Sequence, residues 1–232
     1  MAQTTRQKLK EFVSNILTKP ALVFDIETIP DKEKIEAYYT QEELSEKETL
    51  YEVSIGFHRV ISFACTEVRY NPTTKNFEKS DTKLLFNPDD ELQLLLDVSK
   101  IMQQYEYFIT FNGSRYDFPV LERRALFHGL QKSYKDNTER LLLKELVLSC
   151  SELQWCHWKH LDIFNLLNLK GQKGGLALLL DYMGLQKHNN MTGKEVYSLH
   201  QSKDYETLKQ YATKDAELEA TLFIELVNFF RS

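Results

Sequence analysis

Four acidic residues stand in positions where their side chains could hold a metal ion. Asp25 and Glu27 follow an apolar run in the stretch LVFDIETIP, and on a strand two residues at this spacing point from the same face. Asp117 follows the apolar segment YFITF through the loop NGSRY, and Asp215 lies in the helical pattern YATKD. If these carboxylates converge, they repel one another unless a cation lies among them.

Hard oxygen ligands of this kind suit Mg²⁺ or Mn²⁺. Two such ions about 4 Å apart are a common device for phosphodiester hydrolysis, in which one activates the attacking water and the other stabilises the leaving oxygen. Tyr211 stands four residues before Asp215, so both occupy one face of a helix. Each motif alone has an ordinary explanation as a strand end, an Asn-Gly turn or an amphipathic helix. The three motifs in this order indicate metal-dependent chemistry.

The elements that position these residues follow from the spacing of apolar side chains. The spacing predicts helices over 5–18, 89–104, 118–129, 174–184 and 204–229, and strands over 21–26, 58–68, 82–86, 107–113 and 160–164. Asp89 or Asp90 is expected to cap the second helix, and the polar stretch 31–52 to form a helical excursion at the surface. We therefore predict an α/β fold with a mixed central sheet of about five strands flanked by helices, whose site lies at strand ends.

Composition limits the class of protein. The chain has 232 residues, of which 42% are hydrophobic and 12% aromatic, enough to build one core. We expect a single domain over 1–232, with a helical extension over 1–19 and the core over 20–230. The net charge of −5 argues against a protein that coats nucleic acid through a basic face. It does not argue against an enzyme whose contact with nucleic acid is local and bridged by metal.

Cysteine usage and hydropathy indicate the compartment. The three cysteines form no Cys-x-x-Cys pair and no zinc-ligand pattern, so we expect a reducing compartment with neither a zinc site nor a disulfide framework: Cys65, Cys150 and Cys156. The N-terminal stretch lacks the apolar centre of a signal peptide, and no segment approaches the ~20 apolar residues of a membrane span. We expect a cytoplasmic protein that does not act at a membrane.

The three motifs carry a resemblance to a known family. FDIET, FNGSRYD and YATKD resemble the motifs of the DEDD-type 3′–5′ exonucleases, which have a ribonuclease H-like (RNase H-like) fold. The resemblance is greatest to the predicted stand-alone exonucleases related to the proofreading domain of family B DNA polymerases. Four further stretches support it and extend it from about residue 20 to 230: FHRVISF, FNGSRYDFPVLERRALFHG, HLDIFNLL and TGKEVY. The core over 20–230 is therefore expected to be RNase H-like.

The resemblance assigns roles to the acids. It implies that the metal ligands are Asp25, Glu27, Asp117 and Asp215. Asp25 would lie between two ions, Mg²⁺ or Mn²⁺, with Glu27 and Asp215 on the first ion and Asp117 near the second.

The same resemblance implies roles for other polar side chains. Tyr211 would orient the attacking water. The residue five positions before the last acid is Gln210 and not His, which is typical of the tyrosine branch of the family. Thr28, Asn112 and Tyr116 would contact the 3′-terminal nucleotides. The first two can hydrogen-bond sugar or phosphate, and the tyrosine can stack on any base.

Other residues leave alternatives open. Asp162 in HLDIF either lines the cleft or makes structural hydrogen bonds. His58 and His128 are expected to be core or surface side chains and not ligands. Trp155 and Trp158 either form a base-stacking wall or pack beneath a loop, and we expect the packing.

The sequence thus predicts a metal-dependent 3′–5′ exonuclease that acts on the 3′ ends of single-stranded nucleic acid, DNA rather than RNA, and releases nucleoside 5′-monophosphates. One alternative is a nucleic-acid binding module that keeps this fold with weak catalysis. Another is an adaptor that binds proteins through its acidic segment 31–52 and an apolar face. The sequence identifies no protein partner.

Overall fold

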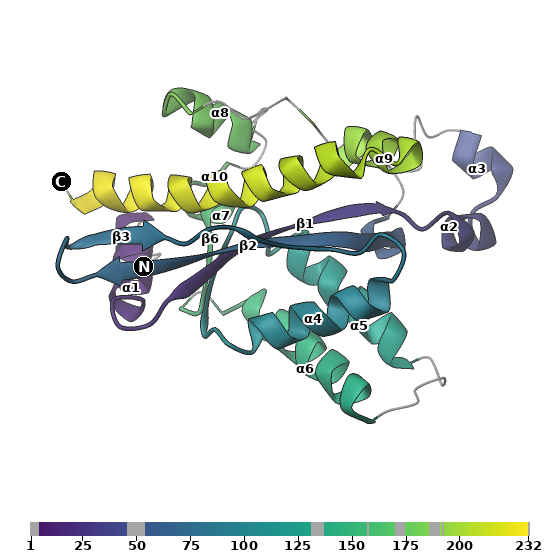
Figure 1. Cartoon of the computed structure of the whole chain (residues 1–232), viewed down its shortest axis with the longest axis horizontal. Coiled ribbons are helices and arrows are strands. Elements are labelled where there is room, and N and C mark those ends of the chain that lie inside the picture. Colours follow the sequence, from purple (N-terminus) through teal and green to yellow (C-terminus); the bar gives the residue numbers. More distant parts are fainter. Residues whose placement is uncertain are drawn as a thin grey trace.

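One mixed sheet forms the centre of the molecule, with helices on both of its faces (Figure 1). The computed structural model describes residues 5–45, 54–130, 137–156, 158–169, 175–185, 191 and 193–231. The strand order is β3-β2-β1-β5-β6, and β4 pairs with β2 beside this path. The strands are β1 (Ala21–Pro30), β2 (His58–Asn71), β3 (Asn76–Lys79), β4 (Lys83–Phe86), β5 (Tyr107–Thr110) and β6 (His160–Asp162).

The long strand β1 lies between an antiparallel and a parallel neighbour. It pairs antiparallel with β2 along its whole length, with a bulge between Glu27 and Thr28. Its parallel pairing with β5 ends at Val23, opposite Ile109. Beyond that pair, the edge of β1 that faces β5 must find other hydrogen-bond partners. This is the part of the strand that carries the acidic motif.

Helices cover the two faces in separate groups. On one face lie α4 (Glu91–Met102), α5 (Asp117–Leu130) and α6 (Asn137–Leu153), and on the other lie α1 (Thr5–Asn15) and the long α10 (Tyr205–Arg231). The remaining helices are α2 (Lys32–Tyr38), α3 (Gln41–Ser45), the 3₁₀ helix η2 (Ile55–Phe57), α7 (Ile163–Leu166), α8 (Gly175–Tyr182) and α9 (Gly193–Ser202). None of the helices in the described ranges is both long and apolar enough to cross a bilayer.

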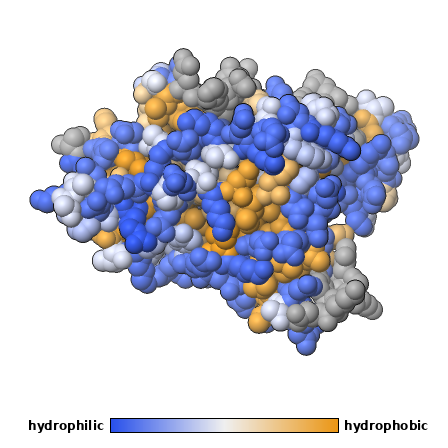
Figure 2. All heavy atoms as spheres, in the orientation of Figure 1, coloured by the Kyte–Doolittle hydropathy of each residue, from blue (hydrophilic) through white to orange (hydrophobic). Residues whose placement is uncertain are grey.

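The alternation of side chains along β1 decides where the acids point. Leu22 and Phe24 pack into the core beneath α4, α5 and α6, and Phe24 stacks on Phe63 with ring centroids 5.0 Å apart. Ala21 and Val23 belong to the core beneath α1 and α10. Asp25 and Glu27 continue this second set, so the two carboxylates face α10. On the face seen in Figure 2, apolar atoms gather between α10 and α4, and polar atoms surround them.

The structure confirms most of the predicted elements and adds five: β3, η2, α6, α7 and α9. The predicted strand 160–164 ends at Asp162, where α7 begins. The cap of α4 is Asp90, whose side chain accepts from the N–H of Gln93. The sheet has six strands, because β3, which was not among the predicted strands, pairs with the end of β2. Helices α6 and α9 were not predicted, and α5 runs one residue past Gly129, where an end was expected. The excursion over 31–52 contains α2 and α3, and its residues 46–52 lie outside the described ranges.

A buried ion-pair network joins α4, α5 and the end of β1. Arg124 is 4% exposed and Glu91 is 6% exposed. The Arg124 Nε donates to Glu91 Oε1 at 2.9 Å, and its Nη1 lies 3.1 Å from Asp31 Oδ2. Glu91 also bonds His128 Nε2 at 2.9 Å and accepts from the N–H of Val60 at 2.6 Å. His128 is therefore part of a structural network, as a core histidine was expected to be.

Candidate metal-binding site

Three carboxylates from two elements meet over the centre of β1. One oxygen each from Asp25, Glu27 and Asp215 lie within 4.8 Å of one another. Glu27 and Asp215 are buried, and Asp25 is partly exposed. The cluster forms because β1 directs its two acids toward the helix that carries the third. The three side chains supply closely spaced oxygen donors of the kind that hard divalent cations prefer.

The fourth predicted acid reaches the same stretch of β1 through the backbone. Asp117 begins α5, is 3% exposed, and accepts a hydrogen bond through Oδ1 from the N–H of Ile26 at 3.3 Å. Ile26 stands beyond the point where β5 stops pairing with β1, so the carboxylate takes the place of a strand partner. This bond holds Asp117 beside the strand segment that carries Asp25 and Glu27.

The loop between β5 and α5 has a backbone that only certain residues allow. Asn112 has φ = 69°, in the left-handed region that Asn tolerates better than most residues. A Cβ at Gly113 would lie 2.3 Å from Thr110 Oγ1, so a larger residue cannot stand there without a shift. The N–H of Gly113 donates to that same hydroxyl at 3.1 Å. This tight turn directs the chain from the end of β5 into the first turn of α5.

Asp162 fixes the loop from the neighbouring strand. Its Oδ1 accepts from the N–H of Asn112 at 3.0 Å, and its Oδ2 accepts from the N–H of Ser114 at 3.2 Å. The same carboxylate caps α7 by accepting from the N–H and side-chain amide of Asn165. The structure shows the hydrogen-bonding role considered for Asp162, and the residue also lines a pocket of about 310 Å³ beside the loop.

The three predicted substrate contacts lie in or beside this loop. Thr28 is 1% exposed, and its hydroxyl lies 2.6 Å from that of Tyr116. His58 Nδ1 lies 3.0 Å from the Tyr116 hydroxyl, and the histidine is buried, as expected of a core side chain. The Tyr116 ring is half-buried, whereas Asn112 is held at the turn. Thr28 is therefore buried more deeply than Tyr116, to which its hydroxyl is hydrogen-bonded.

Burial and mutual repulsion disfavour the charged forms of the acids at this site. Burial raises the pKa of Asp25 well above its usual range, and the charges of Glu219, Glu27, Asp117 and Asp215 raise it further. Burial likewise raises the pKa of Asp117 to about 7, although hydrogen bonds from its own N–H and that of Ile26 oppose this change. Convergent acids without a cation hold protons more tightly than isolated ones.

Tyr211 lies on the same side of α10 as Asp215. Its side chain is 9% exposed, and its hydroxyl donates to the carbonyl oxygen of Met191 at 3.3 Å. Burial, the charges of Glu27 and Asp215, and a hydrogen bond to Asp215 all raise its pKa. The phenol therefore stays neutral and keeps its proton. Tyr211 lines a pocket of about 420 Å³ together with Met191 and other side chains of α10.

Glu219 is an acid of this cluster that sequence reasoning missed. It follows Asp215 by one helical turn, is 3% exposed, and has the largest effect of any charge on the pKa of Asp25. The available signal was its spacing of four residues from Asp215. An acid on a helix is ordinarily solvated, so this spacing alone did not predict burial.

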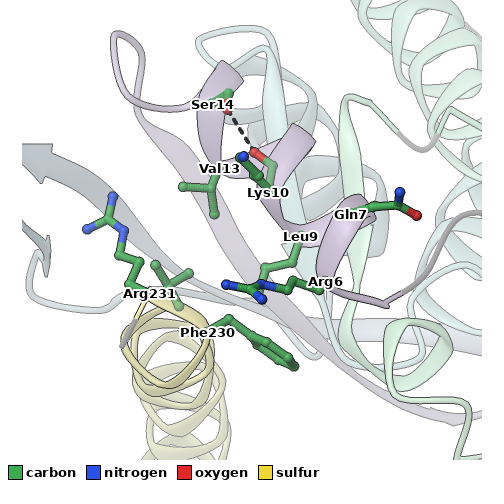
Figure 3. A pocket seen from close by; sticks show the side chains of 9 residues that line it. Arg6, Gln7, Leu9, Lys10, Val13, Ser14, Phe230 and Arg231 are labelled. Carbon is green, nitrogen blue, oxygen red and sulfur yellow. Dashed lines mark hydrogen bonds between the residues drawn. The ribbon is translucent and has the colours of Figure 1, made fainter.

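A second hollow lies between α1 and the last turn of α10 (Figure 3). It has a volume of about 510 Å³ and is lined by cationic side chains, including Arg6, Lys10 and Arg231, above the apolar Leu9 and Phe230. Among the described side chains that line it there is no carboxylate. This hollow therefore offers a hard cation no carboxylate ligands, unlike the acids on β1 and α10.

The two tryptophans are a correction to the sequence analysis. Trp155 is 78% exposed and Trp158 is 59% exposed, so neither packs beneath a loop as expected. Both follow α6 in a turn that leads into β6.

The chain is similar in sequence to known proteins. Residues 53–228 match a family model described as a predicted 3′–5′ exonuclease related to the exonuclease domain of PolB. The match includes Asp117, Tyr211 and Asp215 and begins after Asp25 and Glu27. The catalytic subunit of DNA polymerase epsilon from Schizosaccharomyces pombe is 26% identical over 150 residues, which are 63% of this chain and 7% of that protein.

A solved structure shows the same fold. The family B DNA polymerase of the hyperthermophilic archaeon Pyrobaculum calidifontis superimposes with a TM-score of 0.50 at 14% identity. The match covers 90% of this chain and 24% of that polymerase. It confirms the predicted α/β fold of RNase H-like type, with a mixed sheet flanked by helices.

Proposed function

We propose that this chain, which belongs to the family of predicted 3′–5′ exonucleases related to the exonuclease domain of PolB, is a metal-dependent nuclease. It would remove nucleotides from the 3′ ends of single-stranded nucleic acid, DNA rather than RNA, and release nucleoside 5′-monophosphates. The observation that carries the proposal is the meeting of Asp25, Glu27 and Asp215 within 4.8 Å. The proposal treats residues 1–232 as one nuclease domain, with 1–19 as an extension.

The donor set fits Mg²⁺ or Mn²⁺. The closely spaced groups are carboxylates, and the charges that raise the pKa of Asp25 all belong to acids. We assign Asp25, Glu27 and Asp215 to the cation site and Asp117 to its second side, as ligands for two ions. Bound there, the ions would activate water and stabilise the leaving oxygen of the phosphodiester. The protein supplies the fixed placement of the acids on β1, α5 and α10.

Tyr211 has the properties of a water-orienting group. Its raised pKa keeps the phenol neutral, so the hydroxyl can donate one hydrogen bond and accept another. It lies beside Asp215, where an attacking water would be held between the two side chains. Gln210 occupies the position where the other branch of the family has its histidine, and this supports Tyr211 as the orienting residue.

The loop residues would receive the 3′-terminal nucleotides. Tyr116 offers a half-buried ring for stacking, and the hydroxyl of Thr28 steadies the Tyr116 hydroxyl at 2.6 Å. Asn112 would hydrogen-bond the sugar or phosphate from a backbone position that Asp162 fixes. Contacts of this kind recognise an end and not a sequence.

Blocked oligonucleotides test the direction of cleavage. With Mn²⁺ present, the native protein should release mononucleotides from a strand blocked at its 5′ end and leave a strand with a 3′-phosphate intact. Chelator should stop the reaction. Cleavage of the 3′-blocked strand, or rapid cutting of a circular strand, would refute the proposed polarity. Matched DNA and RNA strands decide the preferred substrate, and binding without metal-dependent turnover would favour the alternative of a binding module.

A further inference from the structure

An exposed tryptophan borders the loop of the candidate site. Trp158 is 59% exposed and lines a pocket of about 310 Å³ together with Lys8 of α1, Ser114 of the loop and Asp162 at the start of α7. Indole side chains are highly buried on average, so an exposed one that lines a pocket beside the candidate site is a place to look for a binding surface. Trp155, although more exposed, lies outside this lining.

We propose that Trp158 is a stacking platform for a base of the single-stranded nucleic acid whose 3′ end lies at the carboxylate cluster, and that Lys8 contacts the backbone of the same strand. The inference rests on the nuclease function proposed above and adds a second place at which the strand is held. Stacking on an indole accepts every base, which suits an enzyme that reads ends and not sequence.

Two residues connect the pocket to the loop between β5 and α5. Asp162 lines the pocket and also accepts the backbone N–H groups of Asn112 and Ser114. Ser114 itself lies in the pocket lining, two residues before Tyr116. A strand that leaves the loop toward the edge of the sheet at β6 therefore meets Trp158 next. This continuity favours nucleic acid over an unrelated partner.

The backbone carbonyls of Trp158 and Lys159 are held by α1 and β5. The side-chain amide of Asn15 on α1 donates to the Trp158 carbonyl oxygen at 3.3 Å. The neighbouring Lys159 carbonyl oxygen accepts from the N–H of Phe108 on β5 at 2.8 Å. These bonds hold the backbone that carries the indole, so a base that stacks on the ring restricts mainly the rotation of the side chain.

The charges in the pocket assign the phosphate contact to Lys8. Among the ion pairs between described residues, none includes Lys8. Glu11 and Asp162 also line the pocket, but the Asp162 carboxylate is already accepting hydrogen bonds from two loop amides and from Asn165. A cation and an aromatic face in the lining of one pocket fit one nucleotide of a strand.

The chain offers a direct test, because Trp155 and Trp158 are its only tryptophans. Trp155→Phe leaves Trp158 as the sole indole fluorophore, and Trp158→Phe leaves Trp155. A thymidine oligonucleotide is titrated into each variant in chelator, where no turnover occurs. We expect the oligonucleotide to quench the fluorescence of Trp155→Phe and to leave that of Trp158→Phe unchanged.

Affinity gives a second, independent measurement. A fluorescently labelled oligonucleotide should bind Trp158→Ala about 5-fold to 100-fold more weakly than the native protein, and Trp155→Ala with native affinity. Lys8→Ala should lower the salt dependence of binding by about one ionic contact, with Lys10→Ala, whose side chain lines the other hollow, as the control. Thermal melts of all variants verify that they are folded.

Three results would overturn the proposal: quenching that is equal in the two single-tryptophan variants, native affinity in Trp158→Ala, or no binding by the native protein in chelator. Failure of the nuclease proposal is distinguishable from these, because it would appear as absent turnover with Mn²⁺ while binding and quenching persist.

Discussion

Glu91 and Asp25 are both carboxylates in the interior of the fold, and their neighbours differ in charge. Burial alone would raise the pKa of Glu91, but hydrogen bonds from His128 and Arg124 hold it below its usual value. Around Asp25 the charges that act on its pKa belong to other acids and raise it. The chain supplies cations to neutralise Glu91, whereas it brings further acids to Asp25. We infer that Glu91 contributes to the stability of the fold and that Asp25 is placed to bind a cation.

Removing one of the proposed metal ligands should have the largest effect, which is a loss of nuclease activity. Asp215→Ala and Asp25→Ala are expected to lower the rate by ~10³-fold or more, because a lost metal ligand removes several kcal/mol of transition-state stabilisation. Both should stay folded, since each change also relieves repulsion between acids. The matched control is Glu217→Ala, whose carboxylate lies on the same helix and pairs with Lys79 and Lys214. Near-native turnover in a folded Asp215→Ala would remove Asp215 from the site.

Removing Arg124, the cation of the buried network around Glu91, should lower the stability of the fold. Arg124→Met leaves Glu91 and Asp31 without their shared guanidinium, and we expect a loss of about 3–5 kcal/mol in the free energy of unfolding. Urea denaturation measures it, with Arg123→Met as the exposed neighbouring control. Activity per folded molecule should be unchanged. An equal effect of the two arginine variants would mean that the network contributes little.

The contributions of Asp117 and Glu91 to stability should also change with pH in opposite directions. The folded-state pKa of Asp117 is raised to about 7, so its contribution to stability is present below its unfolded value near 4 and is lost as pH rises through about 7. Glu91 has a lowered pKa, so its contribution is lost only as pH falls below the unfolded value. In chelator, the native protein should therefore lose on the order of 3 kcal/mol relative to Asp117→Asn between pH 5 and 8. A constant difference across this range would contradict the raised pKa.

A divalent cation should relieve the repulsion among Asp25, Glu27 and Asp215 and so stabilise the folded protein. At ~100-fold above its dissociation constant, one Mn²⁺ ion adds about 2.7 kcal/mol of stability, which raises the melting temperature by roughly 5–10 °C. Mn²⁺ should stabilise at least as well as Mg²⁺, because Mg²⁺ gives up its waters reluctantly. Melting curves of the native protein and Asp25→Ala measure the effect. A shift of equal size in both proteins would place the ion elsewhere.

The sequence predicted the residues of the candidate site better than their surroundings. The spacing of Asp25 and Glu27 on a strand, and of Tyr211 and Asp215 on a helix, already requires each pair to share a face. Glu219 could not be predicted in the same way, because its burial depends on β1 lying opposite α10 and not on its own neighbours in sequence.

Tertiary contacts also explain the other differences. The helix α6 contains the continuous apolar run Leu141, Leu142 and Leu143, which hides its helical period, and Leu141 proves to be 55% exposed. The exposure of Trp158 follows from the anchoring of its backbone by α1 and β5, which no local pattern encodes. Hydrophobicity alone predicted burial for this residue and was wrong.

The carboxylate cluster is assembled from residues 25, 27 and 215, with residue 117 beside it. During translation the first two acids are made early, on β1, and the last arrives only with α10, which also covers one face of the sheet. A partly synthesised chain therefore has neither the complete cluster nor a closed core. Contacts between segments so distant in sequence form late and slowly in folding. Nuclease activity gained during refolding should consequently appear with the docking of α10, after the helices on the other face have packed.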